Sequence, residues 1–336
     1  MQTTPSLLRL RTDRPFAVQS ADRFARAGCV TPIRHLAPSR FRLGVADSTR
    51  IGVVFPQTEI GGDLGAVREY VAAVSELGYA HIAVYDHVVG ADPNVHRDWT
   101  GPYDVNSTFL EPFVLFGYLA ALTSLELVTS IIILPQRQTV LVAKQAATLD
   151  LLCAGRLRLG VGLGWNAVEY EALREDFSNR GERVGEQVEL LRKLWTERSV
   201  TFSGRYETVT GAGIAPLPIQ RPIPVWFGGS HPAALRRAGR LADGWFPMME
   251  PGPGLNDAIA TIREAAVEAG RDPWAIGIEG RTSVGRAGED VIARDVAEWR
   301  AAGATHLSLN TMRANLTSVD QHIAALSAAA SVCLAD

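Results

Sequence analysis

The chain has 336 residues and a mass of 36.3 kDa, which suits one large α/β barrel or two small domains. Hydrophobic residues make up 47% of it and charged residues 21%, which excludes a disordered chain, and its 31 glycines follow no collagen-like period. The net charge of -3 is uneven, because residues 1–50 carry a balance of +6 and the remaining 286 residues carry -9. Such an acidic body offers no footprint for nucleic acid or a membrane, so we expect a small-molecule substrate and a homo-oligomer.

The first 48 residues differ from the rest of the chain. They are rich in Arg and poor in acidic residues, which loosely resembles a transit peptide, but they lack the apolar core of a secretory signal. We expect a disordered N-terminal extension over 1–48, or a start codon assigned too early, ahead of one domain over 49–336.

Two features favour a cytoplasmic protein. The three cysteines, at 29, 153 and 333, are far apart and show no metal-ligand spacing, which fits a reducing compartment. The longest apolar stretch, 112–122, is shorter than the roughly 20 residues that a bilayer requires, so we expect no transmembrane helix.

From residue 51 onward, short β-branched runs alternate with helical patterns, which is typical of parallel βα units. The expected strands are 51–55, 81–85, 125–134, 158–163, 224–227, 244–248, 275–283 and 306–310. The expected helices are 64–77, 113–122, 139–152, 167–175, 182–197, 233–241, 256–269, 289–301 and 318–330. Eight strands predict a single (β/α)8 TIM barrel. An insertion after the fourth strand, 200–222, is expected to hold a hairpin or to cover a cleft.

In such a barrel the chemistry lies where the strands end, and the fourth strand ends in a glycine-rich turn. Gly162, Gly164 and Ala167 satisfy the GxGxxA spacing of dinucleotide-binding turns, but they lie in mid-chain and no second Rossmann half is visible. We interpret these glycines as room for the backbone to approach a flat or phosphorylated ligand, with a purely structural turn as the alternative.

The fifth strand runs into a helix through Gly228, Gly229 and Ser230. Ser230 is expected to be the N-cap, and Pro232 stands where the first helical residue would be. The free N–H groups and the helix dipole would form an anion site suited to a phosphate. A simple capped helix is the alternative interpretation.

Asp86 and His87 follow the second strand, where they could bond a ligand or move a proton near neutral pH. Together with Asp92 and His96 they match no standard metal-binding spacing, so we expect no metal site.

Other candidates lie in the loops around the same rim. Glu59 and Glu111 could face substrate or cap the following helix. Four aromatic residues at strand ends could form the wall of a pocket or fill the barrel end: Trp165, Trp226, Trp245 and Phe246.

Taken together, several segments resemble the luciferase-like monooxygenase superfamily, and more closely its coenzyme F420-dependent oxidoreductase branch. The matching segments are Ile51 to Gln57, Tyr85 to Val88, Leu134 to Arg137, Ala143 to Asp150, Gly155 to Gly162 and Asp243 to Trp245.

This resemblance implies a barrel with an insertion and a deazaflavin or flavin across its rim. Asp86 and His87 would face the cofactor ring. Thr129 and Ser130 would lie beside it, near a non-prolyl cis peptide at Thr129–Ser130 or Ser130–Ile131. The phosphate would be held by Gly162, Leu163, Gly164, Trp165 and Asn166 together with Gly228, Gly229 and Ser230.

The resulting hypothesis is an oxidoreductase that transfers a hydride between F420 and a small organic substrate, with His87 as a ring-positioning donor or acid/base. The alternative within the superfamily is an FMN-dependent monooxygenase, since the same phosphate site accepts either cofactor. Other classes are a metal-dependent barrel hydrolase and a non-catalytic cofactor-binding protein.

Overall fold

The structure is a computed structural model that describes residues 49–285 and 288–334. The extension expected over 1–48 lies outside the described residues. None of the described helices is both long enough and apolar enough to cross a membrane.

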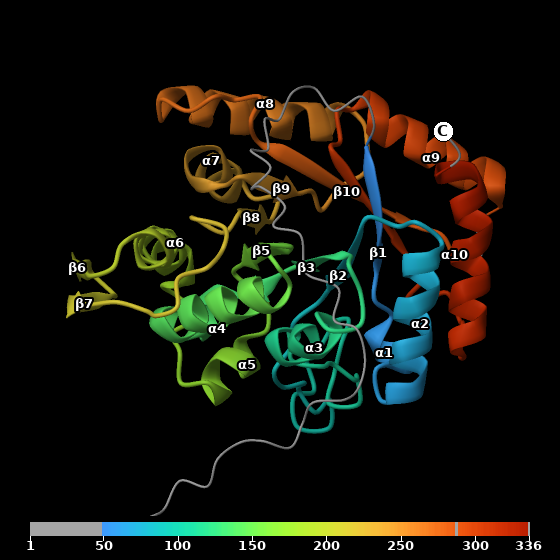
Figure 1. Cartoon of the computed structure of the whole chain (residues 1–336), viewed down its shortest axis with the longest axis horizontal. Coiled ribbons are helices and arrows are strands. Elements are labelled where there is room, and N and C mark those ends of the chain that lie inside the picture. The colour runs from blue at the N-terminus through green and yellow to red at the C-terminus, as the bar shows by residue number, and fades with distance from the viewer. Residues whose placement is uncertain (1–48, 286–287, 335–336) are drawn as a thin grey trace, which may run out of the picture. The chain divides into compact units, whose positions relative to one another are not determined.

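Parallel strands form a closed barrel at the centre of the domain (Figure 1). They are β1 (Arg50–Val54), β2 (His81–Val84), β3 (Glu126–Thr129) with β4 (Ile132–Ile133), β5 (Leu157–Gly162), β8 (Val225–Gly228), β9 (Gly244–Phe246), β10 (Gly277–Ser283) and β11 (His306–Asn310). Both β3 and β4 pair with β5, and β1 pairs with β2 and β11, which closes the sheet. Because β3 and β4 share one position, the barrel has eight positions, and the predicted (β/α)8 fold is confirmed.

Helices surround the strands. They are α1 (Gln57–Ile60), α2 (Leu64–Glu76), α3 (Pro112–Leu119), α4 (Thr139–Leu152), α5 (Ala167–Ala172), α6 (Arg180–Thr196), α7 (Pro232–Leu241), α8 (Pro253–Glu268), α9 (Glu289–Ala301) and α10 (Val319–Cys333), with a 3-10 turn η1 (Leu134–Gln136). Helix α4 begins and ends at the predicted residues. The apolar faces of the helices pack on the outward side chains of the strands, which makes one continuous core.

The insertion after the fourth strand position contains an antiparallel hairpin of β6 (Val200–Ser203) and β7 (Thr208–Ala212), which extends away from the barrel in Figure 1. Glu186 on α6 holds the hairpin turn, because its carboxylate accepts the backbone N–H groups of Arg205, Tyr206 and Glu207. The expectation that the insertion 200–222 holds a hairpin is confirmed.

The third strand differs from the prediction. The expected unbroken strand 125–134 is wrong, because the strand stops at Thr129 and resumes at Ile132 around a cis peptide bond between Ser130 and Ile131. Of the two positions expected for a cis peptide, Thr129–Ser130 and Ser130–Ile131, the structure has the second. Periodicity could not reveal the break, because the β-branched run continues through it.

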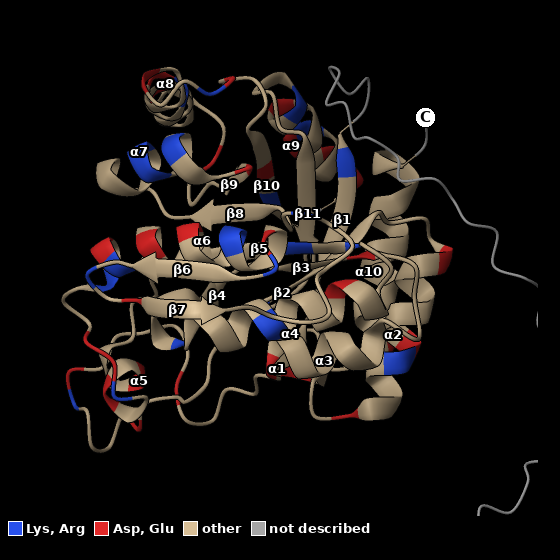
Figure 2. Cartoon of the chain, turned by 60° about the vertical axis from the view of Figure 1, so that its left-hand side comes forward, with Lys and Arg blue, Asp and Glu red and all other residues tan. Residues whose placement is uncertain are grey.

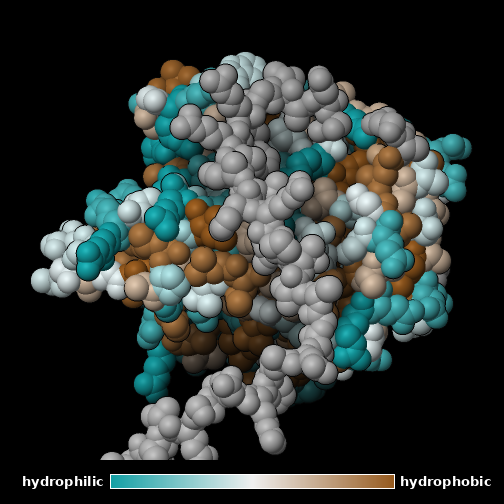
Figure 3. Space-filling model, in the orientation of Figure 1, coloured by the Kyte–Doolittle hydropathy of each residue, from teal (hydrophilic) through white to brown (hydrophobic). Residues whose placement is uncertain are grey.

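Apolar side chains reach the surface on α4, where Val140, Leu141 and Leu152 are 44%, 51% and 60% exposed. Figure 3 shows hydrophobic side chains on this face, over α4. The expected homo-oligomer stays a prediction.

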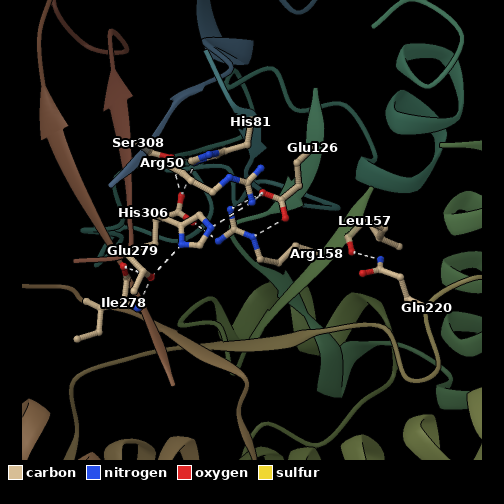
Figure 4. Close-up of polar contacts among 11 residues, drawn as sticks. Arg50, His81, Glu126, Leu157, Arg158, Gln220, Ile278, Glu279, His306 and Ser308 are labelled. Atoms are coloured by element: carbon tan, nitrogen blue, oxygen red, sulfur yellow. Dashed lines mark hydrogen bonds and ion pairs between the residues drawn. The ribbon is translucent and has the colours of Figure 1, made fainter. Parts of the chain in front are cut away.

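Charged side chains fill the barrel interior near the N-terminal ends of the strands (Figure 4). Arg158 on β5 forms ion pairs with Glu279 on β10 and with Glu126 on β3, the latter at 3.1 Å. Glu279 also accepts from Ser308 at 2.6 Å and lies 3.1 Å from His81. Burial alone would raise the pKa of Glu279, but Arg158 and His81 hold that pKa well below its usual value. The carboxylate therefore stays charged in the folded protein.

Replacing Arg158 with Met should lower the free energy of unfolding by about 3–5 kcal/mol, because the buried carboxylate of Glu279 loses its arginine partner, while Glu126 keeps Arg50. Denaturant unfolding measures this loss. Arg205→Met is the matched control: its ion pair with Glu182 is exposed, so it should cost about 1 kcal/mol or less. Equal costs for the two variants would contradict this interpretation.

Acid should destabilise the protein through His306. Burial and the neighbouring Arg158 lower the pKa of His306 from 6.5 to about 2, so the folded protein keeps this ring neutral while the unfolded chain protonates it. The contribution of the neutral His306 ring to the free energy of unfolding is therefore fully present well above pH 6.5. It is lost as the pH drops below this value, by about 2 kcal/mol between pH 7 and pH 5.

Urea unfolding at the two pH values tests this dependence, with His306→Asn as the comparison. The variant should lose less stability on acidification than the wild-type protein. A residual loss is expected from buried His322, whose pKa is also lowered by burial. An unchanged pH dependence in His306→Asn would contradict the assignment.

Candidate active site at the carboxyl rim of the barrel

His87 lies just after β2 in a cage of aromatic rings. The ring centroids of Phe109, Tyr103 and Trp165 lie 4.8, 5.3 and 5.5 Å from that of His87. Trp99 packs on the far side of Trp165 at 5.3 Å. The segment 88–110 thus folds over the end of β2, and with His87 and Asn166 it lines a half-open cavity of about 350 Å³. His87 is the one predicted catalytic residue that faces this cavity.

Glu169, in the first turn of α5, was missed in the sequence. Its side chain is fully buried, and its Oε2 lies 3.5 Å from His87 Nδ1 and 3.2 Å from the donating Gln136 Nε2. Its Oε1 accepts the backbone N–H groups of Val88 and Val89. Burial alone would raise the pKa of Glu169, but the neighbouring His87 and the N–H of Val88 lower that pKa below its usual value. The usable signal was an acidic residue three positions after Asn166, at the start of a helix.

Asp86 points away from the cavity. One carboxylate oxygen accepts from Arg137 at 2.9 Å, and the other accepts the N–H of Ile133 at 3.1 Å. Burial raises the pKa of Asp86, and the guanidinium of Arg137 opposes that rise. Both oxygens therefore bond protein, and Asp86 ties the end of β2 to the segment after the cis bond. Its assignment as a catalytic residue stays a prediction.

The glycines of β5 make room for protein atoms. A Cβ on Gly160 would lie 1.9 Å from the carbonyl oxygen of Thr129, and one on Gly162 would lie 2.7 Å from the Ile131 side chain. Gly164 has a φ of 67°, and a Cβ there would approach Ile133. The broken third strand occupies the space beside Gly162 and Gly164, as the structural alternative expects, and their assignment as cofactor-binding residues stays a prediction.

The turns after β5 and β8 are neighbours, since Val161 pairs with Phe227 in the sheet. Within the described chain, no acceptor is found for six backbone N–H groups of these turns: those of Gly164, Trp165, Asn166, Gly229, Ser230 and His231. Gly229 has a φ of 120°, which favours glycine, and a Cβ there would meet only Ala234. Unpaired backbone N–H groups are donors of the kind that anionic groups such as phosphates use in proteins, and the phosphate site stays a prediction.

Two predicted phosphate ligands have other uses for their side chains. The oxygen of Asn166 caps α5 by accepting the N–H groups of Val168 and Glu169. The expected N-cap at Ser230 is wrong by one residue, because His231 caps α7 by accepting the N–H of Ala233 while Pro232 occupies the first turn. The exposed Ser230 therefore keeps its hydroxyl beside the unpaired N–H groups.

Two further residues belong to this end of the site. Leu163 accepts the hydroxyl of Tyr170 at 2.6 Å, and its side chain lies beside Gly181. Arg237 on α7 donates to the carbonyl of Gly181 at 2.6 Å, which brings a cation next to the Leu163 turn. Figure 2 shows the arginines of α7 in blue. No motif in the sequence singles out Arg237.

The remaining candidates are mostly structural. Thr129 is buried and donates to the Gly160 carbonyl at 2.8 Å, whereas Ser130 is half-buried at the strand break. Glu111 caps α3 at Val114 and pairs with Arg137 at 2.7 Å. Glu59 accepts the N–H of Arg313 at 2.9 Å. Of the two expected roles, facing substrate or capping the following helix, Glu111 has the capping role.

Of the four aromatic candidates, only Trp165 lies beside His87. Trp226 and Phe246 pack together inside the barrel at 5.4 Å, and Arg158 lies 4.4 Å over the Trp226 ring. Trp245 is buried and donates to the carbonyl of Gly229 at 2.8 Å, which anchors the turn after β8. In the described part of the chain, no group of three or more His, Cys, Asp or Glu residues is arranged to hold a metal ion.

Comparison with known proteins gives a family and a fold. The family model for luciferase-like monooxygenase matches residues 35–330. An uncharacterized protein of Mycobacterium tuberculosis is 38% identical over 164 residues, 48% of this chain and 56% of that protein. A protein of Nakamurella multipartita named F420-dependent glucose-6-phosphate dehydrogenase is 37% identical over 134 residues, 39% of each chain. The chain thus spans about half the length of these relatives or less.

Among solved structures, an F420-dependent secondary alcohol dehydrogenase in complex with an F420-acetone adduct superposes with a TM-score of 0.69 at 19% identity. The match covers 83% of this chain and 97% of that one. At this identity the likeness supports the fold.

Gly160→Ala should lower the free energy of unfolding by about 3 kcal/mol, because its Cβ would collide with the Thr129 carbonyl. Thermal or denaturant unfolding measures the loss. Gly117→Ala is the control, since a Cβ in this α3 position meets nothing within 4 Å and should be neutral or stabilising by up to about 1 kcal/mol. A well-tolerated Gly160→Ala would contradict the packing interpretation.

Proposed function

The chain belongs to the luciferase-like monooxygenase family, and from this premise we propose that it is an oxidoreductase transferring a hydride between coenzyme F420 and a small organic substrate. The observation that carries the proposal is the position of His87: the ring lines an aromatic cavity at the same rim as two turns with unpaired N–H groups. The Nakamurella multipartita relative supports F420 as the cofactor.

The chemistry of the rim fits an anionic, planar cofactor. The six unpaired N–H groups after β5 and β8 suit a phosphate, and the cation of Arg237 lies beside the Leu163 turn. The exposed ring of Trp165 and the half-buried side chain of Ile131 offer apolar surface for a flat ring system. When bound, the deazaflavin supplies the two-electron hydride chemistry.

The chain's own residues would bind substrate and move its proton. The cavity beside His87 is lined by the apolar side chains of Phe109 and Val89 and by polar groups such as Tyr103, which would contact a small organic substrate. His87 would exchange a proton with the substrate oxygen as hydride transfer proceeds. Residues of segment 88–110 would therefore set substrate preference.

Cofactor binding is the direct test. Titration of the full chain with F420 and, separately, with FMN should give tight binding of F420 and much weaker binding of FMN. The turns could also hold the phosphate of FMN, which would make the protein an FMN-dependent monooxygenase. Tight FMN binding without measurable F420 binding would therefore overturn the proposal.

Turnover with F420 and a panel of alcohols and aldehydes can be followed by the absorbance of the oxidised cofactor. His87→Asn should lower kcat by about 10²-fold or more, because the proton-transfer group is lost, while F420 affinity stays within a few fold. If His87→Asn turned over substrate at the wild-type rate, His87 would not be the residue that transfers the proton.

A further inference from the structure

We propose that Glu169 is a positioning residue that fixes His87 as the tautomer with its proton on Nδ1, so that Nε2 presents a lone pair to the cavity. The assignment of the tautomer rests on geometry alone. Its catalytic use rests on the proposed function, in which His87 exchanges a proton with substrate.

The Glu169 carboxylate is held rigidly. Two backbone N–H groups, from Val88 and Val89, donate to Oε1, and the Gln136 amide donates to Oε2. The side chain has no exposed surface. Because these donors favour the charged form, Glu169 acts only as an acceptor in this site.

The neutral His87 ring has one donor nitrogen and one acceptor nitrogen. Its Nδ1 faces an oxygen that can only accept, so the proton belongs on Nδ1 and Nε2 becomes the acceptor. The separation of 3.5 Å is long for a hydrogen bond, and such contacts commonly shorten when a ligand closes the site. The other ionisable groups at the ring are Tyr103, in contact with it, and Asp104, which lines the same cavity.

This tautomer suits the oxidation of an alcohol. The O–H proton would pass to Nε2 of His87, while a bound oxidised deazaflavin would supply the acceptor for the hydride that leaves the C–H bond with its electron pair. The O–H electron pair becomes the second bond of the carbonyl. The imidazolium that forms keeps its Nδ1–H toward the Glu169 carboxylate, which stabilises the new charge. Reduction of a carbonyl reverses each transfer.

Glu169→Gln should invert the tautomer. The two backbone N–H groups require an acceptor at the Oε1 position, so the new amide would place its oxygen there and its NH₂ toward His87. Nδ1 would then have to accept, which moves the ring proton to Nε2. The side-chain oxygen of Gln136 is buried without a partner. The Gln136 amide can therefore turn so that this oxygen accepts the second N–H of the amide introduced at position 169.

The test is ¹⁵N NMR of the imidazole nitrogens in the full chain without cofactor, near pH 8, where imidazoles are ordinarily neutral. The His87 signals are identified by their loss in His87→Asn. The wild-type protein should show the Nδ1–H form, and Glu169→Gln should show the Nε2–H form. Glu171→Gln, on the exposed face of the same helix, is the matched control and should leave the wild-type pattern.

An Nε2–H ring in the wild-type protein overturns the proposal, even if Glu169→Gln fails to fold. An unchanged tautomer in a folded Glu169→Gln protein also overturns it. With F420 and an alcohol, Glu169→Gln should lower kcat about 10²-fold with KM within a few fold. If the tautomer inverts but F420 neither binds nor turns over, the proposed function fails while the role of Glu169 stands.

Discussion

The guanidinium of Arg158 is the central interaction of this barrel. It bridges Glu279 on β10 and Glu126 on β3, so three of the eight strand positions meet at one buried charge. Removing charges from water is costly, and the arrangement is tolerable because each carboxylate has a cation and further donors. Its planar contact with Trp226 fills the adjacent interior. The interior near the N-terminal ends is thus occupied by a fixed polar network, and open space remains at the opposite rim.

The geometry of that rim follows from the break in the third strand. Where β3 ends, the side chain of Ile131 occupies the space left by Gly162 and Gly228, and the N–H of Ile133 donates to Asp86. Asp86 in turn binds Arg137, which pairs with Glu111 at the start of α3. A chain of ion pairs and hydrogen bonds therefore fixes the end of β2, and His87 follows directly from it.

Much of the fold could be predicted from the sequence, because its elements have strong local signals. Helix α4 matches its predicted bounds, and the Gly- and Pro-rich insertion contains a hairpin. Roles that depend on tertiary contacts could not be predicted. Gly160 lies beside Thr129 of β3 and Gly162 beside Ile131 in the strand break, and periodicity does not predict either contact. Trp226, at a strand end, packs inward on Arg158. Local capping rules also allowed Ser230, and the structure uses the next residue.

Glu169 illustrates why a site can be hidden in a recognised motif. The sequence drew attention to the glycine-rich turn after β5, while the residue that contacts His87 lies three positions beyond Asn166. Asn166 caps α5 by accepting the N–H of Glu169 itself, and its amide donates to the carbonyl of Val89 at 3.3 Å. Asn166 therefore links the turn after β5 both to Glu169, which contacts His87, and to Val89, two residues after His87. Because the body of the chain is acidic, an anion at this rim would depend on the unpaired N–H groups of the turns and not on overall charge. The turn that would bind the anion also carries Asn166, which is hydrogen-bonded to the Glu169 that contacts His87.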